Sequence, residues 1–214
     1  MKKNSDKERE ILESLCARHP ELPGDKIREA AELLYQTYQS GGKLLLCGNG
    51  GNASDAEHIV GELMKGFRLK RELKETEKAR FRGIDGGEEL AGRLQRAIPA
   101  ISLNSQTSLI TAIGNDTSYE MIFAQQVYAY GRPEDCLIAM STSGNSANVA
   151  AAVKTARALG MKTLGITGSR PCALSKLCSL CILLPAHETW QIQEYTLPVY
   201  HALCAMLEER MFGE

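Results

Sequence analysis

The chain has 214 residues, of which 43% are hydrophobic, and this is enough for one well-buried α/β domain. The formal net charge is −1 and no segment forms a long basic stripe, so the composition gives no indication of nucleic-acid binding. The charged start lacks the apolar core of a signal peptide, and no apolar run approaches the roughly 20 residues that span a bilayer. We therefore expect a cytoplasmic protein with no membrane partner.

The cysteines are the next feature of the composition. Seven of them are scattered along the chain, mostly in apolar surroundings, which indicates buried reduced thiols. Cys178 and Cys181 form a C-x-x-C motif with Cys172 nearby, so a metal or redox role is an alternative. That alternative is disfavoured because Cys181 opens an apolar run typical of a buried strand, and no second pair completes a zinc site.

A pair of N-terminal helices is predicted over residues 1–40, because apolar residues between 26 and 40 recur at helical spacing and end at Gly41-Gly42. Short apolar runs then alternate with helical patterns. The expected strands are 43–47, 98–103, 136–140, 162–167 and 180–184. This alternation predicts an α/β fold in a single domain over 1–214, with a five-stranded parallel sheet flanked by helices. Ligands of such folds bind beyond the carboxyl ends of the strands.

One segment, about 68–97, breaks the regular spacing between the first sheet helix and the second strand. It is rich in Lys, Arg and Glu. Its second half is expected to form an amphipathic helix with Leu90, Leu94 and Ile98 facing inward, and its first half a charged helix. A solvated insertion without a chemical role is the simplest interpretation, because runs of charge usually mark exposed faces. A lid or an oligomer contact is the alternative.

The loop Ser141-Thr142-Ser143-Gly144-Asn145-Ser146 lies between the strand that ends at Met140 and a helical pattern that begins near Ala147. Its hydroxyls, a glycine that permits close backbone approach, and the free N–H groups of a helix start suit a phosphate dianion. The loop therefore predicts a phosphate site for a sugar phosphate. A simple helix cap is the alternative, because Ser and Asn are good N-caps.

An earlier loop, Gly48-Asn49-Gly50-Gly51-Asn52-Ala53, follows the first predicted strand and opens a helix. Its letters match the dinucleotide fingerprint G-x-G-x-x-A, so a nicotinamide oxidoreductase is one interpretation. A dinucleotide site also needs an acidic residue at the end of the second strand, yet the residue that closes this apolar run is Asn104. A phosphomonoester is therefore favoured over a dinucleotide.

Two predicted helices carry polar side chains suited to acid–base catalysis or metal binding. His58 and Glu62 stand at i and i+4 after the first glycine loop, so an imidazole and a carboxylate share one helix face and can share a proton or a metal. The last helix offers polar groups within an otherwise apolar pattern: Gln191, Gln193, Glu194 and His201. Gln193 and His201 are about two turns apart and roughly 80° around an ideal helix.

These motifs, together with Gly114-Asn115-Asp116 and with Ala147-Asn148-Val149 directly after the hydroxyl-rich loop, resemble the phosphoheptose isomerases, a branch of the sugar isomerase (SIS) domain family. The resemblance covers roughly residues 26–212 except for the insertion. It implies an enzyme that interconverts sedoheptulose 7-phosphate and D-glycero-D-manno-heptose 7-phosphate through an enediol. It also implies a homotetramer with zinc at intersubunit active sites. The alternative is a non-catalytic SIS module that binds sugar phosphates as a sensor or assembly factor.

The resemblance assigns roles to particular residues. The implied zinc ligands are His58, Glu62, Gln193 and His201. Glu62 and His201 are also the implied catalytic pair, with Glu62 removing the proton beside the carbonyl and His201 serving the oxygen. The implied phosphate ligands are Ser141, Thr142, Ser143 and Ser146. The implied contacts to the rest of the substrate are Asn49, Gly50, Gly51, Asn52, Asn115, Asp116 and Gln193.

Three positions depart from the family pattern. Asn52 stands in place of a serine, Gly66 in place of an arginine and Trp190 in place of an aspartate. All three lie around the expected substrate, so the departures leave the particular sugar open. Lys65 or Arg68 is expected to supply the missing positive charge.

Overall fold

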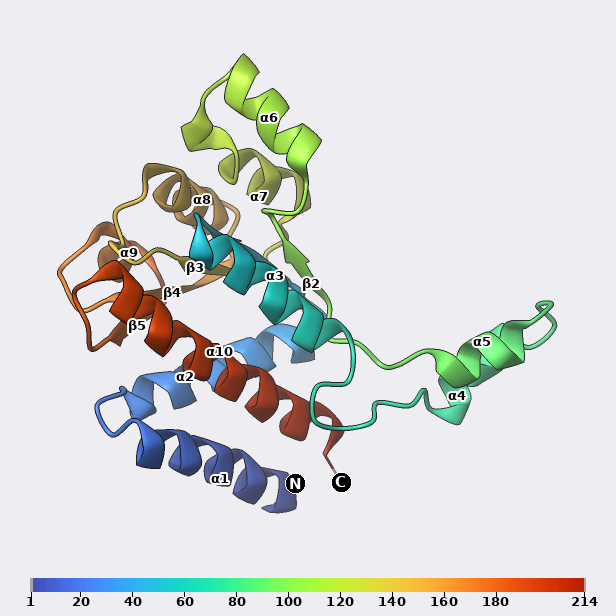
Figure 1. Ribbon diagram of the computed structural model, residues 1–214. Helices are drawn as coiled ribbons and strands as arrows, with labels where there is room; N and C mark the ends of the chain where they lie inside the picture. The colour runs from blue at the N-terminus through green and yellow to red at the C-terminus, as the bar shows by residue number, and fades with distance from the viewer. Residues whose placement is uncertain (1, 214) are drawn as a thin grey trace.

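The computed structural model describes residues 2–213, and Met1 and Glu214, at the ends of the predicted domain, lie outside the described residues. Two helices come first, α1 (Lys2–Arg18) and α2 (Gly24–Gln39), as the sequence predicts. Helix α2 buries one apolar stripe, and both helices pack against the last helix of the chain. These contacts place the N-terminal pair on one side of the molecule (Figure 1).

Five parallel strands form one sheet in the order β2-β1-β3-β4-β5, which confirms the predicted α/β fold. The strands are β1 (Leu44–Gly48), β2 (Ala100–Ser102), β3 (Cys136–Met140), β4 (Lys162–Gly168) and β5 (Leu180–Leu184). Strand β2 has only 3 residues, fewer than the predicted 98–103. The strand is short because Pro99 has no N–H to donate to the ladder and the chain turns at Asn104.

Helices cover both faces of the sheet, and alternate strand residues point into two separate cores. Leu44 and Leu46 belong to the core under α2, α3 and α10, whereas Leu45 belongs to the core under α8. The main remaining helices are α3 (Gly51–Met64), α6 (Thr107–Asp116), α7 (Ala124–Tyr130), α8 (Ala147–Ala158), α9 (Ala173–Leu177) and α10 (Thr189–Phe212).

The strand order reverses between β1 and β3. After β1 the chain moves outward to the edge strand β2 and then returns to β3 on the other side of β1. At such a reversal the loops after two neighbouring strands lead in opposite directions and leave a crevice at the carboxyl ends. The loops after β1 and β3 are the two ligand loops that the sequence predicts.

The charged insertion projects from the body as an arm (Figure 1). The arm contains the short helices α4 (Glu75–Lys78) and α5 (Gly87–Arg93), with the 3-10 turn η1 (Ala79–Phe81) between them. The prediction that Leu90 and Leu94 face inward is wrong, because their exposed fractions are 51% and 41%. The arm stands clear of the body (Figure 1), so of the three residues predicted to face inward Ile98, at the return to the sheet, is the one that is buried.

The thiols of the C-x-x-C motif are free. Burial raises the pKa of Cys178 to about 11 and that of Cys181 to about 12. These shifts disfavour the thiolate that metal binding and redox chemistry require. Within residues 2–213, no helix has both the length and the apolar character needed to cross a membrane.

Candidate active site

The hydroxyl-rich loop connects β3 to the N-terminus of α8. Ser141 Oγ lies 2.9 Å from Ser146 Oγ and 3.5 Å from Ser143 Oγ, so three hydroxyls gather at one point. Gly144 takes a left-handed conformation at φ 65°, and a Cβ there would lie 2.3 Å from Cys172 Sγ. The loop can therefore hold this shape only with glycine, and its hydroxyls and the α8 N-terminus suit a phosphate.

A cavity of about 320 Å³ opens beside this loop and includes Thr142 and Ser143 in its lining. Its other walls come from the loop after β4, which carries Arg170, from the loop after β5 and from the start of α10. The volume suits a small phosphorylated ligand. Arg170 adds a positive charge at this cavity, and its Nη2 lies 3.9 Å from Oε1 of Glu188 in the same lining. No sequence pattern predicted Arg170, because an isolated loop arginine is usually a solvated surface residue.

The glycine loop after β1 is tied to α8 by a pair of amides. Asn49 and Asn148 exchange two hydrogen bonds, each 2.9 Å long, between their side-chain amide and carbonyl groups. Tyr119 lies in the turn after α6, and its hydroxyl donates a hydrogen bond to Asn49 Oδ1 at 3.4 Å. The pair therefore holds the two ligand loops together, and neither Asn148 nor Tyr119 was predicted as a site residue. Asn148 lies within the motif that carries the resemblance, which was its only signal.

The first turn of α3 packs against α10. A Cβ on Gly51 would lie 2.5 Å from Gln193 Nε2, so the Gln193 amide rests on the start of α3. Gly50 takes φ 58°, another left-handed conformation. Asn52 is buried beneath the loop against Gly48. The structure thus brings Gln193 to the glycine loop rather than to His58.

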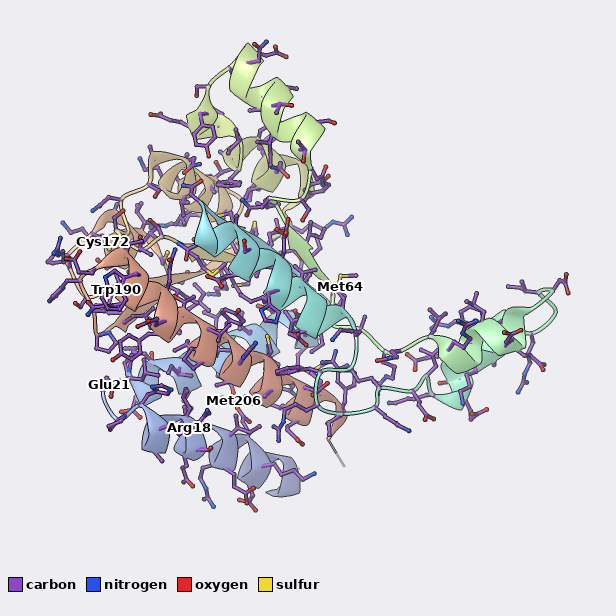
Figure 2. All side chains as sticks on the ribbon, viewed as in Figure 1. Arg18, Glu21, Met64, Cys172, Trp190 and Met206 are labelled. Carbon is purple, nitrogen blue, oxygen red and sulfur yellow. The ribbon has the colours of Figure 1, made fainter. Side chains whose placement is uncertain are left out.

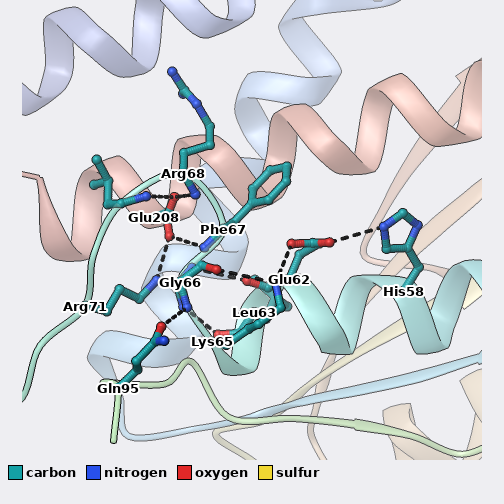
Figure 3. Close-up of polar contacts among 11 residues, drawn as sticks. His58, Glu62, Leu63, Lys65, Gly66, Phe67, Arg68, Arg71, Gln95 and Glu208 are labelled. Atoms are coloured by element: carbon teal, nitrogen blue, oxygen red, sulfur yellow. Dashed lines mark hydrogen bonds and ion pairs between the residues drawn. The ribbon is translucent and has the colours of Figure 1, made fainter. Parts of the chain in front are cut away.

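An imidazole and a carboxylate meet farther along α3, as the i, i+4 spacing predicts. His58 Nε2 lies 3.2 Å from Glu62 Oε1 (Figure 3). Lys65 Nζ lies 3.2 Å from Glu62 Oε2 and gives the carboxylate a cation partner. The Tyr200 hydroxyl, from α10, lies 2.8 Å from His58 Nδ1 and fixes the orientation of the ring. Tyr200 was not predicted as a site residue, because a single tyrosine on an apolar helix does not differ in pattern from a core residue.

His201 joins this pair from α10. Its ring centroid lies 5.0 Å from that of His58, and its Nε2 is buried with no hydrogen-bond partner among the described residues. Burial lowers the pKa of His201 below its ordinary value, and the neighbouring His58 acts in the same direction. The lowered pKa favours a neutral imidazole near pH 7, which can both accept and donate a proton.

His201 lines a cavity of about 610 Å³ that lies between α1, α10 and the turn after α3. The cationic side chains in the cavity lining are Lys7, Arg18 and Arg68. This cavity differs from the one beside Thr142 and Ser143. Within one chain, therefore, the phosphate loop and the His201 imidazole face different cavities.

The predicted pair Asn115 and Asp116 lies at the end of α6. Both side chains are exposed, and Asn115 Nδ2 donates to Asp116 Oδ1 at 2.9 Å. Helix α6 lies at the outer edge of the molecule in Figure 1. The structure does not bring this pair to Glu62 or His201 within one chain.

Three of the four predicted metal ligands lie together. Zinc accepts imidazole nitrogen and carboxylate oxygen, which His58, Glu62 and His201 offer, and the unpartnered Nε2 of His201 is the kind of atom that a metal would satisfy. The donor chemistry therefore fits zinc. No three His, Cys, Asp or Glu side chains within residues 2–213 already surround one point as metal ligands do.

The structure accounts for one departure from the family pattern. A Cβ on Gly66 would lie 2.5 Å from the Leu69 carbonyl oxygen and 2.8 Å from Gln95 Oε1, so the turn and the base of the arm leave no room for an arginine. Of the two expected replacements, Lys65 contacts Glu62 and Arg68 lines the His201 cavity. Trp190, at the start of α10, is 61% exposed (Figure 2).

The doubly wound sheet with a hydroxyl-rich loop at its switch point defines a SIS domain, and the SIS domain family model matches residues 9–83 and 86–168. The phosphoheptose isomerase of Roseiflexus sp. (strain RS-1) is 42% identical over 184 residues, which cover 86% of this chain and 81% of that protein. The chain belongs to the phosphoheptose isomerase family of SIS domain proteins.

Solved structures agree with this assignment. The phosphoheptose isomerase from Francisella tularensis is 31% identical with a TM-score of 0.73, and the match covers 94% of this chain and 96% of that one. The enzyme of the same name from Neisseria gonorrhoeae is 30% identical with a TM-score of 0.70, covering 95% and 92%.

Proposed function

We propose that the protein is an aldose–ketose isomerase that interconverts sedoheptulose 7-phosphate and D-glycero-D-manno-heptose 7-phosphate through an enediol. The observation that carries this function is the meeting of the Glu62 carboxylate with the His58 and His201 imidazoles in a chain of the phosphoheptose isomerase family. A module that only binds a sugar phosphate does not need a carboxylate and two imidazoles in contact with one another. No specific observation favours that alternative or a nicotinamide oxidoreductase.

The proposed mechanism begins with the phosphate, which the Ser141–Ser146 loop holds at the start of α8. Glu62 removes the proton from the carbon beside the carbonyl and returns it to the neighbouring carbon. His201 exchanges the proton between the two oxygens, a role suited to an imidazole with a lowered pKa. Asn49 and Gln193 contact the sugar chain at the glycine loop, and Asn52, buried against Gly48, supports that loop from beneath. Asn115 and Asp116 contact the sugar chain from a neighbouring subunit, because within one chain they do not reach Glu62 or His201 (Figure 1).

We also propose that zinc is the cofactor. His58, Glu62 and His201 would hold it, with Gln193 as the fourth ligand. When bound, Zn²⁺ supplies a Lewis acid that polarises the substrate carbonyl and stabilises the charge that develops on its oxygen. The assignment of Gln193 has the least support, because its amide rests against Gly51.

The function is tested by incubating the protein with five- to seven-carbon ketose phosphates in deuterated water and following the carbon-bound protons by NMR. We expect deuterium at the carbon beside the carbonyl with a seven-carbon substrate, faster with zinc-loaded than with chelator-treated protein. Incorporation of deuterium reports proton removal even when the position of the equilibrium conceals net conversion of the substrate. Binding of the sugar phosphate without exchange under both metal conditions would instead identify a binding module.

We further propose a homotetramer with active sites shared between subunits, in the cytoplasm. The separate cavities of the phosphate loop and His201 support shared sites, because a second copy can bring one to the other. Exposed apolar side chains available for contact include Tyr128 (68%) and Leu197 (44%). A reducing compartment suits the buried thiols of Cys47 and Cys136.

Size-exclusion chromatography with light scattering tests the assembly. We expect a mass of about four chains at micromolar concentration, because shared sites require a stable assembly. A stable monomer that isomerises the substrate would contradict the proposal of shared sites.

A further inference from the structure

A buried ion pair lies between the end of α3 and α10, beside the proposed catalytic groups (Figure 3). Arg71 Nε contacts Glu208 Oε1 at 2.7 Å, and the exposed fraction of each side chain is 0%. Burial of two charges costs about as much free energy as their pairing recovers, so an apolar pair of similar volume often gives equal stability. The presence of this ion pair is therefore better explained by the hydrogen bonds that its two charged groups make with the backbone than by a gain in folding free energy.

Glu208 accepts hydrogen bonds from four N–H groups. Besides Arg71 Nε, its oxygens accept from the backbone N–H groups of Phe67 (2.8 Å), Arg68 (2.7 Å) and Leu69 (3.1 Å). One carboxylate therefore fixes the turn that follows α3. The Phe67 ring on this turn lies 5.6 Å from the His201 ring, centroid to centroid, so the turn also forms part of the surroundings of His201.

Arg71 holds the other side of the same region. Its Nη1 donates to the Leu63 carbonyl oxygen at 2.6 Å and its Nη2 to the Glu62 carbonyl oxygen at 3.2 Å. Both carbonyls belong to the last turn of α3, which has no helical donors for them. The positive charge also suits the C-terminal end of a helix dipole. Arg71 therefore fixes the backbone of the turn that carries the Glu62 carboxylate.

Helix α10 links these two contacts. Glu208 follows His201 by seven residues, about two helical turns, so both project from nearly the same face. One rigid helix thus carries the His201 imidazole and the carboxylate that holds the Glu62 turn through Arg71. We infer that Arg71 and Glu208 are positioning residues that set the Glu62 carboxylate against the His201 imidazole. This inference rests on the proposed function.

Two conservative substitutions test the inference. Glu208→Gln removes the charge and replaces one acceptor oxygen with a donor, whereas Arg71→Lys keeps the charge but loses the planar fork. We expect each variant to lower kcat by about 10- to 100-fold, the size of effect that a 1 Å misplacement produces. KM should change by less than about 3-fold, because the phosphate loop is carried by β3 and α8.

Asp135 supplies a matched control at the N-terminal ends of β1 and β3, away from the ligand loops. Its carboxylate is also buried, contacts Lys43 Nζ at 2.6 Å, and accepts the backbone N–H groups of Lys43 and Arg132 at 2.9 Å each. These residues precede β1 and β3, whereas the ligand loops follow the same strands. Asp135→Asn should lower the thermal midpoint and leave kcat of the folded protein unchanged.

The inference is overturned if Glu208→Gln and Arg71→Lys lower the thermal midpoint as Asp135→Asn does while kcat stays within about 2-fold of wild type. If Glu208→Gln does not fold, Arg71→Lys decides the question by the same criterion.

A second measurement does not depend on turnover. The imidazole NMR signals of His58 and His201 should shift in Arg71→Lys and remain in place in Asp135→Asn. If the wild-type protein isomerises no sugar phosphate, the proposed function fails, and these signals still report the positioning. Unshifted signals in Arg71→Lys would overturn the positioning role.

Discussion

Glu62→Gln is expected to bind sugar phosphate normally and to lose proton exchange at the carbon beside the carbonyl. Glutamine keeps the size and polarity of the side chain but cannot accept a proton, and a positioned general base typically contributes about 10²- to 10⁴-fold to the rate. The phosphate loop lies on other elements, so binding should persist. Calorimetry measures the binding, and NMR in deuterated water measures the exchange.

Glu57→Gln is the matched control for this prediction. Glu57 is another carboxylate of α3, but it accepts a hydrogen bond from Ser105 Oγ at 3.0 Å, on the side toward the edge strand. Exchange in Glu57→Gln should equal that of wild type. Undiminished exchange in Glu62→Gln would show that another group removes the proton.

Gly144→Ala is expected to destroy the phosphate site and to destabilise the protein. The new Cβ would lie 2.3 Å from Cys172 Sγ and 2.7 Å from Thr167 Oγ1, on a backbone at φ 65°. Left-handed strain costs about 1–2 kcal/mol and overpacking about 1–3 kcal/mol. The loop must move to relieve both, so we expect KM to rise by more than about 10-fold, which corresponds to about 1.4 kcal/mol of lost binding. Urea denaturation and steady-state kinetics measure the two effects.

Gly160→Ala separates strain from the effect on the loop. Gly160 also takes a left-handed conformation, at φ 77°, but the nearest atom to a new Cβ is Pro133 Cβ at 3.9 Å, and the position lies at the other end of α8. We expect a loss of about 1 kcal/mol in unfolding free energy with no change in KM. A KM in Gly144→Ala equal to that of wild type would remove the loop from the substrate site.

Local sequence patterns predicted the architecture because strand burial and helix periodicity are set by residues close together in the chain. Buried parallel strands read as continuous apolar runs, and β3 and β5 occupy the predicted residues, 136–140 and 180–184. The i, i+4 contact between His58 and Glu62 follows from helix geometry alone. Such features depend on neighbours along the chain, so one sequence suffices to find them.

The predictions that failed depended on what lies next to a segment in space. Leu90 and Leu94 carry an amphipathic pattern, yet α5 stands on an arm with no body surface beneath it. Arg71 belongs to the same charged segment, which was interpreted as solvated, yet it is among the most buried side chains of the protein. Charge and periodicity describe a segment but do not say which other segment will pack against it.

The sequence by itself determined the parallel sheet, the placement of the glycine loop and the hydroxyl-rich loop at its carboxyl edge, and the pairing of an imidazole with a carboxylate on α3. Only the tertiary structure decided that His201 joins His58 while Gln193 rests on Gly51, and that the phosphate loop and His201 face separate cavities. It also decided that Glu208 reaches Arg71 across 137 residues of chain. The reason is that periodicity and turn chemistry are set by adjacent residues, whereas the packing of α10 on α3 depends on the shapes of both helices at once.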